Sequence, residues 1–194
     1  LDSGNWPIIS ASPLPYLPHS QVPKEATRED MVAIKRQFVA ATKRAAKAGF
    51  DLLEFHAAHG YFLASFLSPL TNRRDDEWGG SFEGRLRFPI EVLRAIRARV
   101  GADFIVGVRM AIDEAKPDGI DTPTGIAILQ RYADESLIDF VNVIRGTIFG
   151  LHTGGNVASI LQVNEHLERN FEIFTAIKTK QSQTPYHTAV PYFL

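Results

Sequence analysis

The sequence predicts an α/β fold in which parallel strands alternate with helices. Three short apolar stretches, at residues 50–55, 104–110 and 139–144, have the length and composition of buried strands. The stretches between them carry apolar residues at helical spacing. Short connections between such alternating strands and helices favour a parallel sheet with right-handed crossovers. The alternation alone fits a closed (β/α) barrel and an open doubly wound sheet equally well. In both folds the functional residues lie at the carboxyl ends of the strands.

The amino-acid composition narrows the class of protein. The 194 residues are 45% hydrophobic and 22% charged, which is ordinary for a soluble globular domain. A net charge of −1 offers no basic field for nucleic acid, and no apolar run approaches the ~20 residues of a membrane helix. The chain has no cysteine, which excludes disulfides and any iron–sulfur cluster held within this stretch. We therefore expect a cytoplasmic protein that acts on a small molecule, without nucleic-acid or membrane partners.

The N-terminal part predicts a loop followed by a helix. Residues 1–26 hold five prolines, which remove backbone donors and oppose a regular helix. Thr27 can cap a helix whose apolar residues form one face, and Gly49 suits the position just past its end. The chain has no initiating Met and no secretory signal, and its first residues have the composition of a loop. We therefore expect a fragment.

The central and C-terminal parts continue the alternation. A polar, glycine-rich loop is predicted at residues 57–80, and Ser81 can cap a helix that ends at Gly101. Pro89 lies inside this helical pattern and predicts a late start or a kink. Further helices are predicted from periodic apolar residues at 124–137 and at 160–177.

Polar side chains follow each of the three predicted strands at the same end. His56, His59 and Tyr61 come after the first strand. Arg109 ends the second strand, and Arg145 follows the third. Two imidazoles can donate N–H groups to one substrate oxygen, a phenol can deliver a proton, and an arginine can stabilise a nearby anion. These residues predict an electrophilic pocket suited to reduction of an activated double bond.

Other interpretations of these residues remain open from their spacing alone. The two histidines could be one packed core residue and one surface residue. A metal-dependent hydrolase could use His56, His59 and Asp113, but a zinc site of this type needs a further ligand at a known spacing, and none is evident. We therefore predict no metal site. Residues 73–77 are predicted to form a loop held by local ion pairs.

Several blocks of special residues stand out between residues 48 and 110. They are Ala48-Gly49-Phe50-Asp51, Glu54, His56-Ala57-Ala58-His59-Gly60-Tyr61, Phe66-Leu67-Ser68-Pro69, Asn72-Arg73-Arg74-Asp75-Asp76-Glu77-Trp78-Gly79-Gly80-Ser81 and Arg85-Leu86-Arg87-Phe88. Together these blocks closely resemble the old yellow enzyme family of NADH:flavin oxidoreductases. The similarity extends more loosely from about residue 6 to residue 146. The resemblance implies a (β/α)8 TIM barrel that binds FMN, of which this chain supplies strands four to six, or about three to four βα units.

The resemblance also implies roles for the residues at the strand ends. His56 and His59 match the pair that hydrogen-bonds the substrate carbonyl or an equivalent anion, and Tyr61 matches the proposed proton donor. Arg109 matches the arginine beside N1 and the C2 carbonyl of the flavin, where a cation stabilises the anionic reduced ring. The implied reaction passes hydride from NAD(P)H through FMN to the C=C bond of an α,β-unsaturated carbonyl. An amine dehydrogenase of the same family is an alternative, although there we expect Tyr in place of His56.

The C-terminal part departs from the family pattern. After residue 146 we expect two further strands and a glycine-rich phosphate loop, and the sequence offers neither. We therefore divide the chain into a partial FMN-binding barrel, residues 1–150, and a divergent helix and tail without an assigned role, residues 151–194. Three or four barrel strands leave two open sheet edges, so we expect weak FMN binding and association, for example as a homo-oligomer. A truncated, catalytically inactive barrel is the alternative to an active enzyme.

Overall fold

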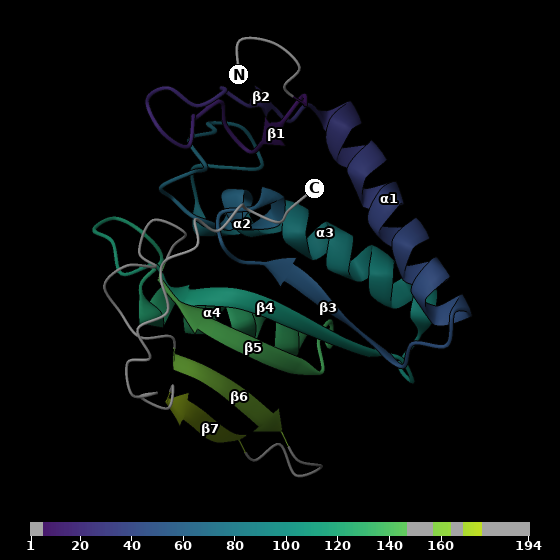
Figure 1. The fold of residues 1–194 in the computed structure, drawn as a ribbon. Helices are drawn as coiled ribbons and strands as arrows, with labels where there is room; N and C mark the ends of the chain where they lie inside the picture. The colour runs from purple at the N-terminus through teal and green to yellow at the C-terminus, as the bar shows by residue number, and fades with distance from the viewer. Residues whose placement is uncertain (1–5, 147–156, 164–168, 176–194) are drawn as a thin grey trace, which may run out of the picture.

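The protein is built on one mixed β-sheet. The computed structural model describes residues 6–146, 157–163 and 169–175 (Figure 1). The sheet has five strands in the order β3-β4-β5-β6-β7. These strands span Leu52–Ala57, Ile105–Asp113, Phe140–Arg145, Val157–Val163 and Arg169–Thr175. The pairs β3–β4 and β4–β5 are parallel, as the sequence predicts, whereas β5–β6 and β6–β7 are antiparallel.

Helices cover one face of the parallel part of the sheet (Figure 1). They are α1 (Arg28–Lys47), α2 (Phe62–Leu67), α3 (Phe82–Val100) and α4 (Thr122–Asp134). The strand side chains on the helical side form the core, and Phe55, Val108 and Val141 among them are at most 3% exposed. A smaller parallel pair, β1 (Ile9–Ser10) with β2 (Lys24–Glu25), lies within the proline-rich N-terminal part.

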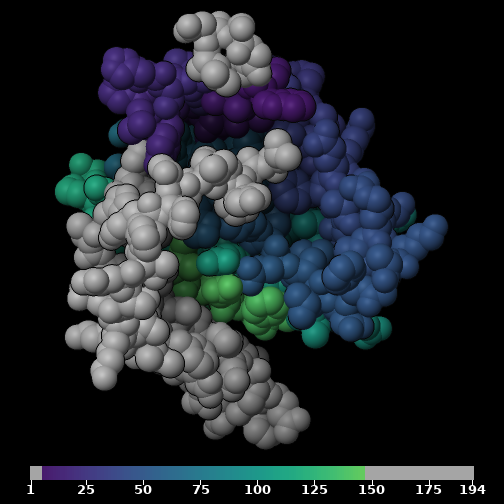
Figure 2. All heavy atoms as spheres, viewed as in Figure 1, coloured from purple at the N-terminus to yellow at the C-terminus, as the bar shows by residue number. Residues whose placement is uncertain are grey.

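The opposite face of the parallel strands carries polar residues, and no helix that the structure describes covers it. His56 is in register with Arg109, and Arg109 is in register with Asn142, so all three lie on this face. Leu52 and Ile105, which pair at the other end of the same face, are 47% and 42% exposed. Teal and green atoms of the central strands remain visible at the surface in Figure 2. The described strands therefore form part of a barrel wall, and the barrel is not closed.

The two predicted helix starts are confirmed by their caps. Thr27 caps α1, and a reciprocal bond from its backbone N–H to the Asp30 carboxylate completes a capping box. Ser81 caps α3 by accepting from the Gly84 N–H. A late start of this helix is wrong, because α3 runs unbroken from Phe82 with the buried Pro89 inside it.

Two other predictions at the level of elements are wrong. The predicted loop at 57–80 contains the short helix α2, whose apolar side chains pack against α3. The predicted helix at 160–177 is replaced by strands β6 and β7, which pair antiparallel with each other. This stretch is rich in β-branched and aromatic residues, which suit a strand, and pairing with β5 satisfies the backbone of β6. Most of the segment 151–194 lies outside the described residues.

Candidate active site

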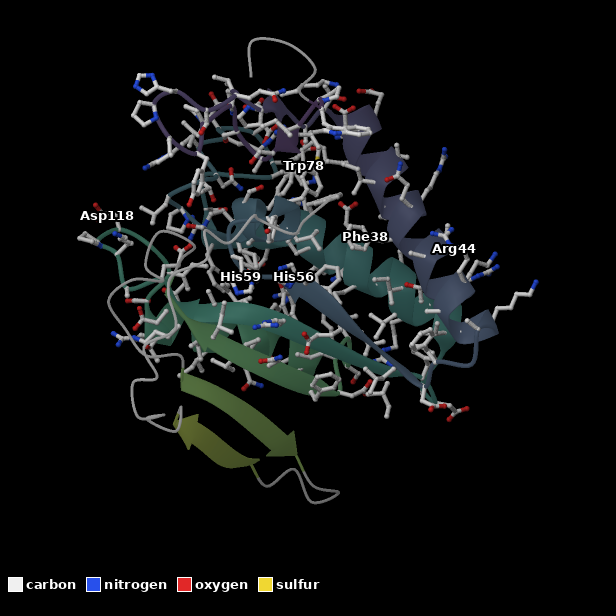
Figure 3. All side chains as sticks on the ribbon, in the orientation of Figure 1. Phe38, Arg44, His56, His59, Trp78 and Asp118 are labelled. Atoms are coloured by element: carbon white, nitrogen blue, oxygen red, sulfur yellow. The ribbon has the colours of Figure 1, made fainter. Side chains whose placement is uncertain are left out.

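The end of β3 and the middle of β4 bring the predicted site residues together. The prediction that Arg109 ends its strand is wrong, because β4 continues to Asp113 and Arg109 lies in its middle, level with the carboxyl end of β3. His56 and Arg109 are Cα partners across the two strands. The His56 ring centroid lies 5.2 Å from that of His59 and 5.5 Å from that of Tyr61. Figure 3 shows the two histidines next to each other near the end of β3. His59 and Arg109 are therefore both neighbours of His56, near the carboxyl end of β3.

The turn after β3 determines where His59 and Tyr61 lie. His59 has a φ of 59° and Gly60 a φ of 73°, so two successive residues adopt the left-handed region. Histidine visits this region more readily than bulkier or β-branched residues, although at a cost in backbone strain. Tyr61 then occupies the N-cap position of α2 and is 42% exposed. The double left-handed turn is what returns the His59 ring to the neighbourhood of His56.

Burial and a neighbouring cation lower the pKa of both histidines and favour their neutral form. Burial lowers the pKa of His56, and the positive charge of Arg109 lowers it further, against a small opposing effect of Glu54. Burial likewise lowers the pKa of His59, followed by the effects of His56 and Arg109. A neutral imidazole still offers one ring N–H as a donor. The pair can therefore donate to a carbonyl oxygen or an oxyanion without a charge of its own.

Arg109 has an unused donor that fits a flavin. Its Nε is buried and has no hydrogen-bond partner among the described residues. A buried donor without an acceptor is unfavourable, so this N–H suits a ligand with an acceptor edge. FMN has such an edge at N1 and the C2 carbonyl, which gains negative charge when the ring is reduced. The residues near this end of β3 thus fit the polar edge of the FMN ring, with Arg109 as the group that would hold it.

Two residues of the open face were missed as site residues. Asn142 Nδ2 donates to Glu54 Oε2 at 3.1 Å, which links β5 to β3 across β4. Glu54 lies two positions before His56 on the same strand and therefore on the same face. Because alternate residues of a strand share a face, the sequence could have placed Glu54 beside His56. Asn142 could be found only from the strand register.

A cavity of about 330 Å³ adjoins His59 on the side of the turn after β4. Its lining includes Ala57, His59, Leu67, Glu114, Lys116 and Ile120. Glu114 is only 8% exposed, and its Oε2 accepts from Ser68 Oγ and from the Ile120 N–H, both at 2.7 Å. The sequence did not point to this carboxylate, because its burial depends on contacts with Ser68, just after α2, and with the turn that contains Ile120.

Asp113 and Arg145 do not join the histidines. Asp113 accepts from the Ala115 N–H at 2.7 Å and from Thr122 Oγ1 at 3.1 Å, and the first of these bonds is the main reason for its lowered pKa. Arg145 is 65% exposed and contacts Asp113 at 3.4 Å. Among the described residues, no three His, Cys, Asp or Glu side chains are grouped to hold a metal ion. The grouping needed for the hydrolase alternative is therefore not seen in this part of the chain.

The loop at 73–77 is held by ion pairs, as predicted. Arg74 is 9% exposed and forms a two-bond pair with Asp76, with its Nη2 at 2.5 Å from Asp76 Oδ2. Its Nη1 donates to the carbonyl oxygens of Ala11 and Ala26. Arg74 therefore fastens the N-terminal segment to this loop and has a structural role.

Comparison with known proteins identifies the family. The sequence signature of the NADH:flavin oxidoreductase / NADH oxidase family matches residues 11–182, which is most of the chain. The chain belongs to this family. The match continues past residue 150 and therefore includes much of the segment that we could not assign from the sequence. The family is one of flavin-dependent oxidoreductases, which agrees with the resemblance described above.

Individual relatives cover several chemistries. The chain is 41% identical over 148 residues to a probable N-methylproline demethylase of Rhizobium meliloti, covering 76% of this chain and 22% of that protein. It is 39% identical to an NADPH dehydrogenase of Geobacillus thermodenitrificans, covering 73% of this chain and 41% of that protein. A 2-naphthoyl-CoA reductase structure superposes with a TM-score of 0.68 at 29% identity, over 73% of this chain and 21% of that one. The chain thus spans between about a fifth and two fifths of the length of these proteins.

No helix within the described ranges combines the length and the apolar composition that crossing a lipid bilayer requires.

Proposed function

We propose that this chain carries the substrate-activating part of an FMN-dependent ene-reductase. The substrate would be an α,β-unsaturated carbonyl compound, and NAD(P)H would be the reductant. The observation that carries the proposal is the grouping of two histidines, 5.2 Å apart, with Tyr61 and Arg109 near the carboxyl end of β3. Membership of the flavin oxidoreductase family supports it.

Each residue has a distinct part in this proposal. His56 and His59 donate ring N–H groups to the substrate carbonyl and withdraw electron density from the conjugated C=C bond. Tyr61 delivers a proton to the α-carbon from its phenol. Arg109 would hold the polar edge of the FMN ring and stabilise negative charge there when FMN is bound. FMN, when bound, supplies the hydride that adds to the β-carbon.

Replacing His56 with alanine tests the carbonyl-binding role. In the complete protein, His56→Ala should lower kcat for a cyclic enone by about 10²- to 10³-fold, as loss of an oxyanion donor does. His56→Asn, which keeps an N–H donor, should lose less. The measurement is NADPH consumption under anaerobic conditions, with NADPH oxidation in the absence of enone as the internal control. Unchanged enone turnover in His56→Ala would show that this histidine does not hold the carbonyl.

A second candidate function is oxidation of a secondary or tertiary amine. The specific observation in its favour is the 41% identity to a probable N-methylproline demethylase. In this case the same site would hold FMN as the hydride acceptor, and the histidines would bind an anionic group of the substrate. Supplying the complete protein separately with an enone plus NADPH and with N-methylproline plus an artificial electron acceptor separates the two functions.

A further inference from the structure

We propose that the cavity beside His59 binds a small zwitterion, such as an amino acid or an N-alkylated amino acid. Glu114 would take the ammonium group and Lys116 the carboxylate. This inference names a ligand class for the second candidate function, amine oxidation. Only the oxidation of the bound ligand rests on that function. The binding itself is argued from the cavity.

The first observation is an incompletely used carboxylate. Glu114 is more than nine-tenths buried, and both hydrogen bonds to its side chain, from Ser68 Oγ and the Ile120 N–H, go to Oε2. No described residue donates to Oε1, and no described cation forms an ion pair with Glu114. A buried carboxylate is costly unless a cation or further donors compensate it. Because Glu114 lines the cavity, a ligand ammonium group can supply the missing partner.

The second observation is a cation in the same wall. Lys116 is exposed, lines the cavity and forms no ion pair with any described residue. Glu114 and Lys116 lie two positions apart, yet they are not paired with each other. A cavity that offers one anion and one cation, each without a charged partner, is complementary to a ligand that carries both charges.

The turn that presents these groups is held in one conformation. The Glu114 N–H donates to the Ile120 carbonyl at 2.7 Å, and the Gly119 N–H donates to the Lys116 carbonyl at 3.2 Å. Gly119 also packs closely, since a Cβ there would lie 2.9 Å from Glu114 Oε2. A preorganised turn reduces the entropy that ligand binding must overcome.

The size and the walls of the cavity limit the ligand. A volume of about 330 Å³ is at the lower end of the range for small-molecule sites. Ala57, Leu67 and Ile120 contribute apolar surface to the lining. A compact zwitterion with an aliphatic body or small ring therefore fits better than a large aromatic molecule. His59 borders both this cavity and the histidine pair, so the ligand would lie beside the proposed flavin site.

Three probes with the same ring size test the charge requirement. N-methyl-L-proline carries both charges, N-methylpyrrolidine only the cation, and cyclopentanecarboxylate only the anion. Isothermal titration calorimetry on the full 194-residue chain, without flavin, should show N-methylproline binding at least tenfold more tightly than either of the others. Equal affinities, or no binding of N-methylproline at millimolar concentration, would overturn the proposal.

Matched variants locate the binding. Glu114→Gln should weaken N-methylproline binding at least tenfold. Lys116→Gln should weaken it by a similar factor, and because Lys116 is exposed, this change does not alter a buried side chain. Asp118→Asn, an exposed acid of the same turn outside the cavity lining, should leave the affinity unchanged. If Glu114→Gln fails to fold by circular dichroism, Lys116→Gln still decides. If folded Glu114→Gln or Lys116→Gln bound N-methylproline with wild-type affinity, the proposed zwitterion site would be wrong. The effect of His56→Ala on enone turnover tests only the ene-reductase proposal and is independent of this result.

Discussion

At the scale of single residues, the charge state of the histidines depends on one arginine. Arg109 lies in register with His56 and lowers the pKa of both His56 and His59, in addition to the effect of burial. Two neutral imidazoles can approach each other without charge repulsion, which a protonated pair could not do. The guanidinium therefore serves two purposes in the proposed site. It would offer a donor to the flavin, and it favours the neutral form of the neighbouring rings.

Replacing Arg109 with methionine should raise the pKa of both histidines. Removal of the positive charge leaves burial as the main cause of the shift, so each pKa moves back toward the ordinary value of about 6.5. In the wild type the folded pKa is below the unfolded one. These histidines therefore stabilise the fold fully above about pH 6.5 and progressively less as the pH falls through their folded pKa. Arg109→Met should reduce that loss. Titration of the imidazole signals by NMR measures the shift directly.

Arg145→Met provides the matched control for this experiment. Arg145 follows the next strand but contacts Asp113 and does not contribute to the histidine pKa values. Its removal should leave both titration midpoints where they are in the wild type. An equal shift in both variants would mean that the effect comes from net charge and not from Arg109.

A second prediction at this scale concerns a tyrosine in the core. Tyr132 of α4 is fully buried, and its hydroxyl has no hydrogen-bond partner among the described residues. Burial accordingly raises the pKa of this phenol. Tyr132→Phe removes an uncompensated polar atom and should increase the free energy of unfolding by about 1 kcal/mol. Urea denaturation measures the change in the free energy of unfolding, provided that the m-value is unchanged. Tyr132→Ala should instead lower the free energy of unfolding by about 3–5 kcal/mol. A clear destabilisation by Tyr132→Phe would indicate an unseen partner for the hydroxyl.

At the scale of elements, local signals located the helices better than periodicity did. Thr27 and Ser81 act through hydrogen bonds to residues three positions ahead, so their effect can be predicted from the local sequence. The periodic apolar residues at 160–177 suited a helix, but β6 and β7 form because they can pair with each other and with β5. Such pairing depends on distant residues, and a single stretch of sequence does not reveal it.

The same distinction applies to the candidate site. The grouping of His56, His59, Tyr61 and Arg109 could be predicted because neighbouring parallel strands place residues of one face side by side. The exact level of Arg109, in the middle of β4, required the strand register. Glu114 was not found, because its burial depends on Ser68, which is 46 positions away in the sequence. Groups placed by strand order can thus be predicted from the sequence, whereas groups placed by loop packing require the structure.

The close packing of α4 on β4 predicts that a substitution favourable for helix propensity will destabilise the protein. Alanine normally stabilises a helix by about 1 kcal/mol relative to glycine. At Gly125, however, a Cβ would lie 2.2 Å from the Ile112 carbonyl oxygen and 2.6 Å from Ile112 Cγ1. Gly125→Ala should therefore destabilise the protein by about 1–3 kcal/mol, because backbone must move to accommodate the methyl group. Thermal and urea unfolding provide the measurement.

Ala127→Gly is the companion variant on the same helix. Ala127 is exposed, so this change should cost only the propensity difference of about 1 kcal/mol. If Gly125→Ala were instead stabilising, the close approach of α4 to β4 would be wrong.

At the scale of the whole molecule, the described sheet has the two faces of a barrel wall without the closure of a barrel. Its helical face is buried, whereas its opposite face exposes Leu52 and Ile105 beside the polar site residues. β3 and β7 are the edges of the described sheet. The groups that we propose for binding the flavin ring therefore lie on a face that none of the described helices covers.

This asymmetry predicts how the chain binds flavins. Arg109 and the histidines can meet the polar edge of the ring, but the N-terminus of α4, which follows β4, is already capped by the Asp121 carboxylate. No glycine follows Gly155 in the sequence, so this part of the chain lacks the glycines that a phosphate loop of this type uses. The 194-residue chain should therefore bind FMN and riboflavin with similar, weak affinities, since the phosphate gains no partner. Quenching of flavin fluorescence gives both dissociation constants, and Arg109→Met should weaken both equally. Tight stoichiometric binding of FMN, with riboflavin bound much more weakly, would mean that the chain holds a phosphate site after all.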